Sequence, residues 1–156
     1  MAEELKINTQ LTKAELYQQL LPQLQALLHN ETDVIANMAN VSAVLKQAFN
    51  FWWVGFYIVK NNELVLGPFQ GTLACTRIAL NKGVCGKAWA QNKTIVVPNV
   101  NEFDGHIACS SLSQSEIVVP KSTNGVVSFV LDVDSEFLNH FDAVDEKYLN
   151  EIVNLL

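Results

Sequence analysis

The segment FWWVGFYIVKNNELVL, residues 51–66, marks the point where the hydrophobic pattern of the chain changes to a period of two. Two sets of side chains alternate along it: Trp52, Val54, Phe56 and Ile58 on one side, and Trp53, Gly55, Tyr57 and Val59 on the other. Such alternation is typical of a β-strand. Because Asn61 and Asn62 supply a turn before the apolar residues 64–66, the segment predicts a β-hairpin.

Helical periodicity surrounds this hairpin in the sequence. Thr12 and Glu15 have the spacing of a capping box, and leucines then recur at helical intervals, which predicts a helix over 12–29. Pro22 should kink or divide this helix, because proline lacks an amide donor and crowds the preceding turn. Two more helices are predicted: one over 31–49 with Asn30 as its cap, and one that starts near Asp142.

The middle of the chain is predicted to consist of short strands and turns. The expected strands are 74–80, 94–97, 117–120 and 126–133, with a loop at 67–71, a short helix at 83–90 and a long loop at 98–114. The order of helices, consecutive strands and a final helix predicts an α+β fold. In this fold, an antiparallel sheet carries its helices on one face and leaves the other face for a small-ligand pocket.

Composition limits the classes of function. The 156 residues are 49% hydrophobic, which fits a single domain spanning 1–156. Ten basic and sixteen acidic residues give a net charge of -6 without a basic tract, so nucleic acid is not expected as a partner. The amino terminus lacks the pattern of a secretory signal, and the apolar run 51–59 is far shorter than the ~20 residues of a membrane-spanning helix. We therefore expect a cytoplasmic protein without a membrane segment.

Three cysteines, Cys75, Cys85 and Cys109, form no CxxC pair, which argues against a zinc ribbon or a thioredoxin-type motif. In a reducing compartment such thiols are either buried as small apolar residues or chemically active. Cys109 lies in the string FDGHIAC, where His106 or nearby backbone amides could favour a thiolate. His106 itself is open to two interpretations, a catalytic base or a structural hydrogen-bonding residue.

The last hairpin predicts a cluster of acids. A three-residue loop at 123–125 would place Glu116 opposite Asp132 and put Asp134 one diagonal step away on the same face. Such a patch should raise a pKa or bind a cation, either a metal or an amino group. The alternative is three solvated acids at a hairpin end. The opposite face is apolar and consists of Val127, Phe129, Leu131 and Val133.

An aromatic pair indicates a possible wall of the pocket, and the glycine motifs bear on which ligands it could bind. Trp53 and Tyr57 share one strand face across Gly55, so they could form the wall of a small apolar pocket. The glycines of 83–86 do not have the spacing of a nucleotide-binding loop, and no phosphate site is indicated.

Five ordered strings carry a resemblance to a known family. They are LVLGPFQG (64–71), GVCG (83–86), FDGHIAC (103–109), SEIVVP (115–120) and LDVDS (131–135). They resemble the free methionine-(R)-sulfoxide reductases, which are catalytic GAF domains. The resemblance implies a GAF fold with an enclosed pocket, reduction of free methionine-(R)-sulfoxide, and thioredoxin as the reductant of the thiols. It implies no metal and no organic cofactor.

The resemblance also implies roles for individual residues. Cys109 would be the attacking thiol, Cys75 the resolving thiol, and Cys85 a second thiol able to substitute in the relay. The acidic pocket residues would be Glu116, Asp132 and Asp134, with Trp53 against the substrate methyl group and Tyr57 beside it. Because a sulfoxide oxygen leaves only after protonation, Glu116, crowded by Asp134, is our candidate for the acid. Asp132 and Asp134 could hold the ammonium group of the substrate.

Two other functions remain open from the sequence. A non-catalytic GAF module would bind a small ligand or sense oxidants through its cysteines, and a metal site could be built from cysteines and acids. The fold would also allow a homodimer through its helical layer, although the sequence does not fix one.

Overall fold

The computed structural model describes residues 5–8, 10–107 and 112–156, which form a six-stranded sheet with helices on both sides. The strands are antiparallel in the order β3-β2-β1-β6-β5-β4. They span Trp53–Lys60 (β1), Glu63–Gln70 (β2), Arg77–Ala79 (β3), Ile95–Val97 (β4), Ser115–Thr123 (β5) and Val126–Ser135 (β6). The helices are Lys13–Leu28 (α1), Val34–Phe49 (α2), Gly83–Gln91 (α3) and Ala143–Asn154 (α4), with a 3-10 turn η1 at Val100–Glu102.

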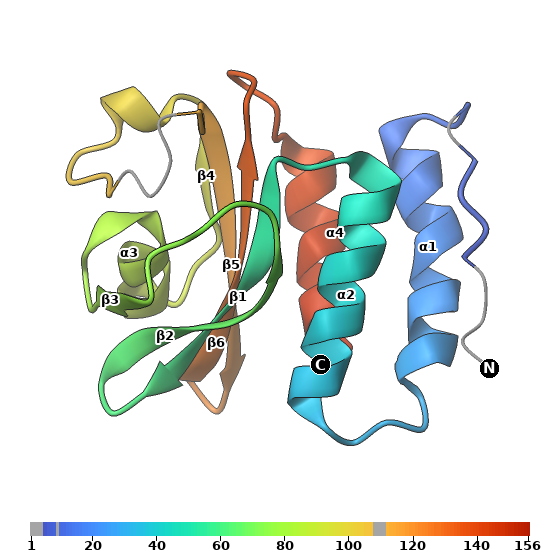
Figure 1. The fold of residues 1–156 in the computed structure, drawn as a ribbon, viewed down its shortest axis with the longest axis horizontal. Helices are drawn as coiled ribbons and strands as arrows, with labels where there is room; N and C mark the ends of the chain where they lie inside the picture. Colours follow the sequence, from blue (N-terminus) through green and yellow to red (C-terminus); the bar gives the residue numbers. More distant parts are fainter. Residues whose placement is uncertain (1–4, 9, 108–111) are drawn as a thin grey trace.

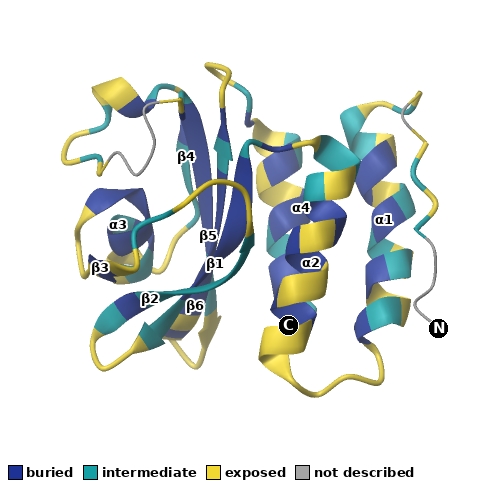
Figure 2. Ribbon diagram, viewed as in Figure 1, coloured by how far each residue is buried: buried dark blue, intermediate teal, exposed yellow. Residues whose placement is uncertain are grey.

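The helices divide unequally between the two faces of the sheet. Figure 1 shows α2 and α4 against one face with α1 outside them, whereas α3 lies on the other face, beside the edge strand β3 and together with η1. The predicted antiparallel α+β arrangement is confirmed. Consecutive residues of β1, β5 and β6 are buried, as Figure 2 shows, because both faces of these strands are covered.

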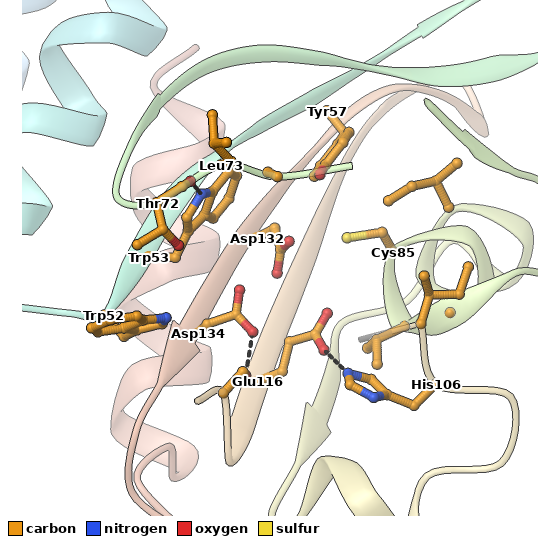
Figure 3. A pocket seen from close by; sticks show the side chains of 16 residues that line it. Trp52, Trp53, Tyr57, Thr72, Leu73, Cys85, His106, Glu116, Asp132 and Asp134 are labelled. Carbon is orange, nitrogen blue, oxygen red and sulfur yellow. Dashed lines mark hydrogen bonds and ion pairs between the residues drawn. The ribbon is translucent and has the colours of Figure 1, made fainter. Parts of the chain in front are cut away.

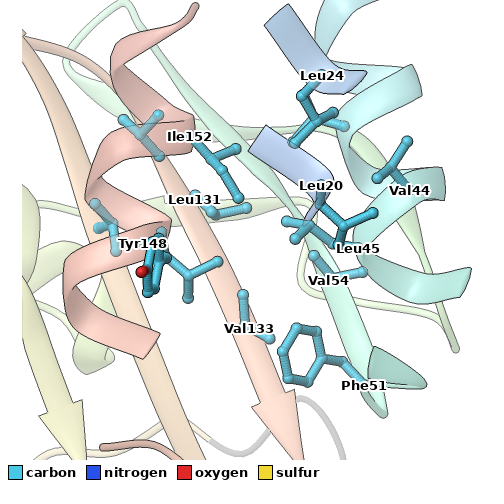
Figure 4. Close-up of a cluster of buried hydrophobic side chains, with 14 of the residues drawn as sticks. Leu20, Leu24, Val44, Leu45, Phe51, Val54, Leu131, Val133, Tyr148 and Ile152 are labelled. Atoms are coloured by element: carbon cyan, nitrogen blue, oxygen red, sulfur yellow. The ribbon is translucent and has the colours of Figure 1, made fainter. Parts of the chain in front are cut away.

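Most of the apolar core lies on the helical side. In Figure 4, Leu20 and Leu24 of α1, Leu45 of α2 and Ile152 of α4 face side chains of the sheet. The sheet contributes Val54, Phe56, Leu131 and Val133 to this cluster, and each of them is fully buried. A second, smaller cluster lies on the opposite face beneath α3. The helical layer therefore supplies most of the hydrophobic stabilisation, and the other face is left for polar groups.

The helix starts follow local capping chemistry. The predicted capping box of α1 is present, since Thr12 N–H donates to Glu15 Oε2 at 2.9 Å and the Thr12 side chain accepts from Glu15 N–H. Pro22 does not divide α1, which continues through it. The prediction of Asn30 as the cap of the second helix is wrong. Asp33 is the cap, because its Oδ1 accepts from the amides of Ile35 and Ala36.

Part of the predicted loop 67–71 belongs to β2. Pairing between β1 and β2 continues to Val54 and Gln70, with an irregularity between Gly55 and Tyr57. Proline cannot donate to a strand ladder, and Pro68 lies within this irregular part. Glycine and proline thus mark a distortion of β2 here, not its end.

The last hairpin has a register that differs from the predicted one. Its turn has two residues, Asn124 and Gly125, both with positive φ (53° and 80°), and Thr123 pairs with Val126. A β-bulge follows, because Ser122 pairs with Val127 whereas Lys121 pairs with Phe129.

The bulge decides which side chains share a face. Glu116 pairs with Asp134, not with Asp132 as predicted, and Asp132 pairs with Val118. The register differs from the prediction by two residues, and an even shift leaves every side chain on the same face of the sheet. The three acids therefore still share a face. Val127, which lies beyond the bulge, joins the second cluster and not the helical side as predicted.

Within residues 5–8, 10–107 and 112–156, each helix is too short or too polar to cross a bilayer.

Candidate active site

A cavity lies on the sheet face opposite the helical layer. Side chains of β1, β5, β6 and α3 line it, together with the segments 72–74, 106–107 and Ser113 (Figure 3). The space between these side chains is about 560 Å³, part of it open to solvent.

An aromatic wall forms one side of the cavity. The rings of Trp53 and Tyr57 lie 6.1 Å apart between centroids, and both residues are buried. Gly55 between them is required by space, because a Cβ atom there would lie 2.3 Å from Phe69 Cβ and 2.7 Å from Trp53 Cη2. Trp53 Nε1 donates to the carbonyl of Thr72 at 3.1 Å, and the Tyr57 hydroxyl donates to the carbonyl of Cys75 at 2.9 Å. These bonds fix both rings in the wall.

Three carboxyl groups form the floor. Glu116 comes from β5 and Asp132 and Asp134 from β6, and all three side chains line the cavity (Figure 3). Glu116 and Asp132 are only 6% and 7% exposed, so the alternative of three solvated acids does not hold. Ser113 Oγ donates to Asp134 Oδ1 at 2.6 Å, and His106 Nε2 lies 3.6 Å from Glu116 Oε2.

Burial shifts the protonation of this cluster. It raises the pKa of Glu116 well above its usual range, and the negative charge of Asp134 raises it further. The pKa of Asp132 is raised well above its usual value by burial and by both neighbouring carboxyls. Burial raises the pKa of Asp134 to about 6, although the hydrogen bond from Ser113 lowers it. Burial therefore favours the protonated forms of Glu116 and Asp132, whereas Asp134, with a pKa of about 6, is ionised at neutral pH. Burial also lowers the pKa of His106, so its imidazole is neutral.

The three cysteines differ in their placement. Cys85, in the first turn of α3, is a buried free thiol of the cavity wall, and burial, with Asp132 and Glu116 nearby, raises its pKa. Its thiolate is therefore disfavoured. Cys75 is disulfide-bonded and lies next to Ala74, which lines the cavity. Cys109, predicted as the attacking thiol, lies outside the described residues.

Several lining residues were missed by sequence reasoning. Trp52 was placed on the core face by alternation, but β1 begins only at Trp53, so the period of two does not extend to Trp52. Ser113 lies in a loop without a hydrophobic period, and no sequence pattern indicated its bond to Asp134. Thr72 was assigned to no element, because it lies between the predicted loop at 67–71 and the predicted strand at 74–80.

Cys85, Glu116 and Asp132 are the group that could hold a metal ion. Each offers one ligand atom, and these atoms lie within 4.8 Å of one another. A thiolate and two carboxylates could bind a divalent cation such as zinc. Any such ion would have to displace protons from groups whose pKa values burial raises.

Comparison with known proteins shows the family of the chain, although no protein-family model matches it. The free methionine-R-sulfoxide reductase of Escherichia coli is 42% identical over 144 residues, which cover 92% of this chain and 87% of that protein. The chain belongs to the free methionine-(R)-sulfoxide reductase family. It is therefore an oxidoreductase, and the predicted family resemblance is confirmed.

Other free methionine-(R)-sulfoxide reductases and GAF proteins agree with this assignment. A structure of the Neisseria meningitidis reductase in complex with its substrate superimposes with a TM-score of 0.95 at 52% identity, covering 97% of this chain and 92% of that chain. GAF domain-containing protein A of Dictyostelium discoideum is 59% identical over 157 residues, with 100% of this chain and 99% of that protein covered. A further GAF domain structure superimposes with a TM-score of 0.91 at 36% identity, covering 97% and 90% of the two chains. The predicted GAF fold is confirmed.

We expect the ionisation of Asp134 to destabilise this reductase. Its pKa is higher in the folded protein than the ordinary value of 3.8, so its favourable contribution is present below pH 3.8 and is lost as the pH rises through about 6. Asp134→Asn, which stays neutral, should raise the free energy of unfolding at pH 7.5 by about 1–3 kcal/mol, and by nothing near pH 4. Urea unfolding at both pH values measures this difference. The exposed Glu151→Gln is the control, and an equal effect of Asp134→Asn at both pH values would contradict the assignment.

Proposed function

We propose that this chain reduces free L-methionine-(R)-sulfoxide to L-methionine, with a cysteine sulfenic acid as intermediate and thioredoxin as the final reductant. The observation that carries the proposal is the set of three carboxyl groups that line one cavity beside an aromatic wall, with Glu116 and Asp132 buried. Support comes from the Neisseria meningitidis relative, whose structure contains its substrate.

The protonated acids of the cavity floor can bind and protonate the sulfoxide oxygen. A thiolate attacks sulfur readily, but the oxygen is a poor leaving group until it has received a proton. Burial and the charge of Asp134 keep Glu116 protonated at neutral pH, so Glu116 can donate that proton. Asp132, which burial also keeps protonated, can hold the oxygen in the same position.

The thiols then carry out the reduction in three steps. The sulfur of Cys109 attacks the sulfoxide sulfur while the oxygen takes up a proton. The S–O bond of the substrate then breaks and an S–O bond forms on Cys109, so that Cys109 is oxidised by two electrons to a sulfenic acid and the sulfoxide leaves reduced as methionine. Cys75 condenses with this sulfenic acid, which releases water and forms a disulfide. A dithiol such as thioredoxin then reduces the disulfide to two thiols and is itself oxidised. The disulfide-bonded state of Cys75 is compatible with the second step.

The remaining groups of the site distinguish a free amino acid from a peptide residue. Asp134 is ionised at neutral pH and can accept hydrogen bonds from an ammonium group. A methionine sulfoxide within a peptide has no such group at its backbone nitrogen. Trp53 and Tyr57 provide an apolar surface for the methyl group of the substrate.

We expect the purified protein to release methionine from free methionine-(R)-sulfoxide when dithiothreitol or thioredoxin is supplied. The (S) epimer and a peptide that contains methionine sulfoxide should give little product, because the site recognises one epimer and a free ammonium group. Amino-acid analysis of the reaction mixture measures the product. Binding of the sulfoxide without release of methionine would instead favour a ligand-binding GAF module.

Replacement of the acid tests the protonation step. Glu116→Gln should lower turnover at least tens-fold, since a positioned acid contributes about 10²-fold or more to such a rate. The amide keeps the shape of the side chain but has no proton of comparable acidity to give. Steady-state rates compared with Glu136→Gln, the same change at an exposed position, measure the effect. Near-normal turnover in Glu116→Gln would remove this residue from the mechanism.

Single-turnover and steady-state assays separate the roles of Cys109 and Cys75. Cys109→Ser should abolish turnover with any reductant, because it removes the nucleophile. Cys75→Ser should still give one methionine per protein in a single turnover but should be recycled poorly by thioredoxin. Rapid-quench measurement of methionine gives both quantities. Full steady-state activity of Cys109→Ser would reject the assignment of the nucleophile.

A further inference from the structure

Trp52 brings an unpaired hydrogen-bond donor to the cavity. Its side chain lines the cavity, and its Nε1 atom is buried without an acceptor in the part of the chain that the structure describes. Figure 3 shows Trp52 well away from Cys85 and His106. In the sequence it precedes Trp53, which pairs with Asp134, so Trp52 lies at the Asp134 end of β1.

The neighbouring indole of Trp53, unlike that of Trp52, has a hydrogen-bond acceptor within the protein. Trp53 lines the same cavity, but its Nε1 is occupied by the carbonyl of Thr72 at 3.1 Å. A buried donor without an acceptor costs free energy, and native proteins keep few of them. At a ligand site, the missing acceptor is most simply an atom of the ligand. Among the buried side-chain nitrogen and oxygen atoms of the described cavity lining, the only other one without a partner is an acceptor, Asp132 Oδ1.

The charges of the cavity limit what this acceptor can be. Its described lining contains three carboxyl groups and one imidazole, but no lysine or arginine. The α-carboxylate of a free amino acid therefore meets no strong cation among these residues and has to be bound by neutral N–H or O–H donors. In the proposed mechanism, the acids of the cavity floor already bind the sulfoxide oxygen, so this oxygen is not the missing acceptor. An indole N–H suits the carboxylate because it donates only and does not lose its proton.

We infer that Trp52 is a specificity-determining residue that donates its Nε1 proton to the α-carboxylate of the substrate. This inference rests on the proposed function, since it assigns one part of the same substrate to one side chain. Trp52 would then recognise one end of the amino acid while the acids act on the other groups. The contact would be equally strong before and during the chemical step, so it would contribute to binding and not to turnover.

Two variants and two substrates test this inference. Trp52→Phe removes the donor, whereas Trp52→Gln keeps an N–H donor on a flexible chain. The substrates are free methionine-(R)-sulfoxide and its primary amide, in which the carboxylate charge is gone. For the free amino acid, Trp52→Phe should raise KM about tenfold or more with kcat nearly unchanged, since hydrogen bonds to charged groups are strong. The carbonyl oxygen of the amide can still accept a weaker, neutral hydrogen bond, so for the amide the rise in KM should be several-fold smaller than for the free amino acid, and Trp52→Gln should recover part of the loss.

The controls separate a lost hydrogen bond from a damaged fold. Trp89→Phe makes the same change in α3, outside the cavity lining, and should leave both substrates unaffected. Calorimetric binding of methionine and methioninamide to each variant gives the same comparison without turnover. Equal losses for the acid and the amide, or no loss for either, would overturn the inference. Failure of the wild-type protein to reduce methionine-(R)-sulfoxide would instead overturn the proposed function.

Discussion

The crowding of three carboxyl groups in one cavity, two of them buried, is the constraint on which the site depends. Glu116 and Asp134 are direct partners across β5 and β6, and Asp132 lies on the same face two residues before Asp134. Because burial opposes ionisation and each charge opposes the next, the cluster retains protons that isolated surface acids would lose at neutral pH. A supply of protons inside a partly closed cavity is what reduction of a sulfoxide requires. The same burial keeps the thiol of Cys85 protonated, so proximity to the acids does not by itself produce a reactive sulfur.

Such a cluster destabilises the folded chain, and the other face of the sheet offsets this cost. The helical layer buries a continuous set of apolar side chains against β1 and β6 (Figure 4). Polar contacts join its outer helix to the rest, since Lys13 of α1 is paired with the fully buried Asp145 of α4 at 2.5 Å, and the Tyr17 hydroxyl donates to Asp145 at 3.0 Å. Stabilisation and chemistry are thus assigned to opposite faces of one sheet, a separation common at sites that carry unfavourable electrostatics.

The sequence predicted two kinds of feature: those that depend on residues close together in the chain, and those that depend on which face of a strand a side chain occupies. The capping box at Thr12 depends on residues three apart, and the aromatic wall depends on alternation within one strand. The shared face of the acids survived an incorrect register because only odd shifts exchange the two faces. Features set by tertiary contact were not predictable in this way. Trp52 enters the cavity because β1 starts one residue later, and Ser113 reaches Asp134 from a loop.

The β-bulge between Lys121 and Ser122 has a consequence for how this hairpin can vary among related chains. A two-residue turn alone would have left the acids of β6 on the face opposite Glu116, and the extra residue at the bulge restores them. Insertions or deletions of a single residue at the turn would undo this correction unless the bulge were lost at the same time. Evolutionary length changes in the hairpin should therefore occur in compensating pairs, which makes its turn far less tolerant of indels than its exposed position suggests.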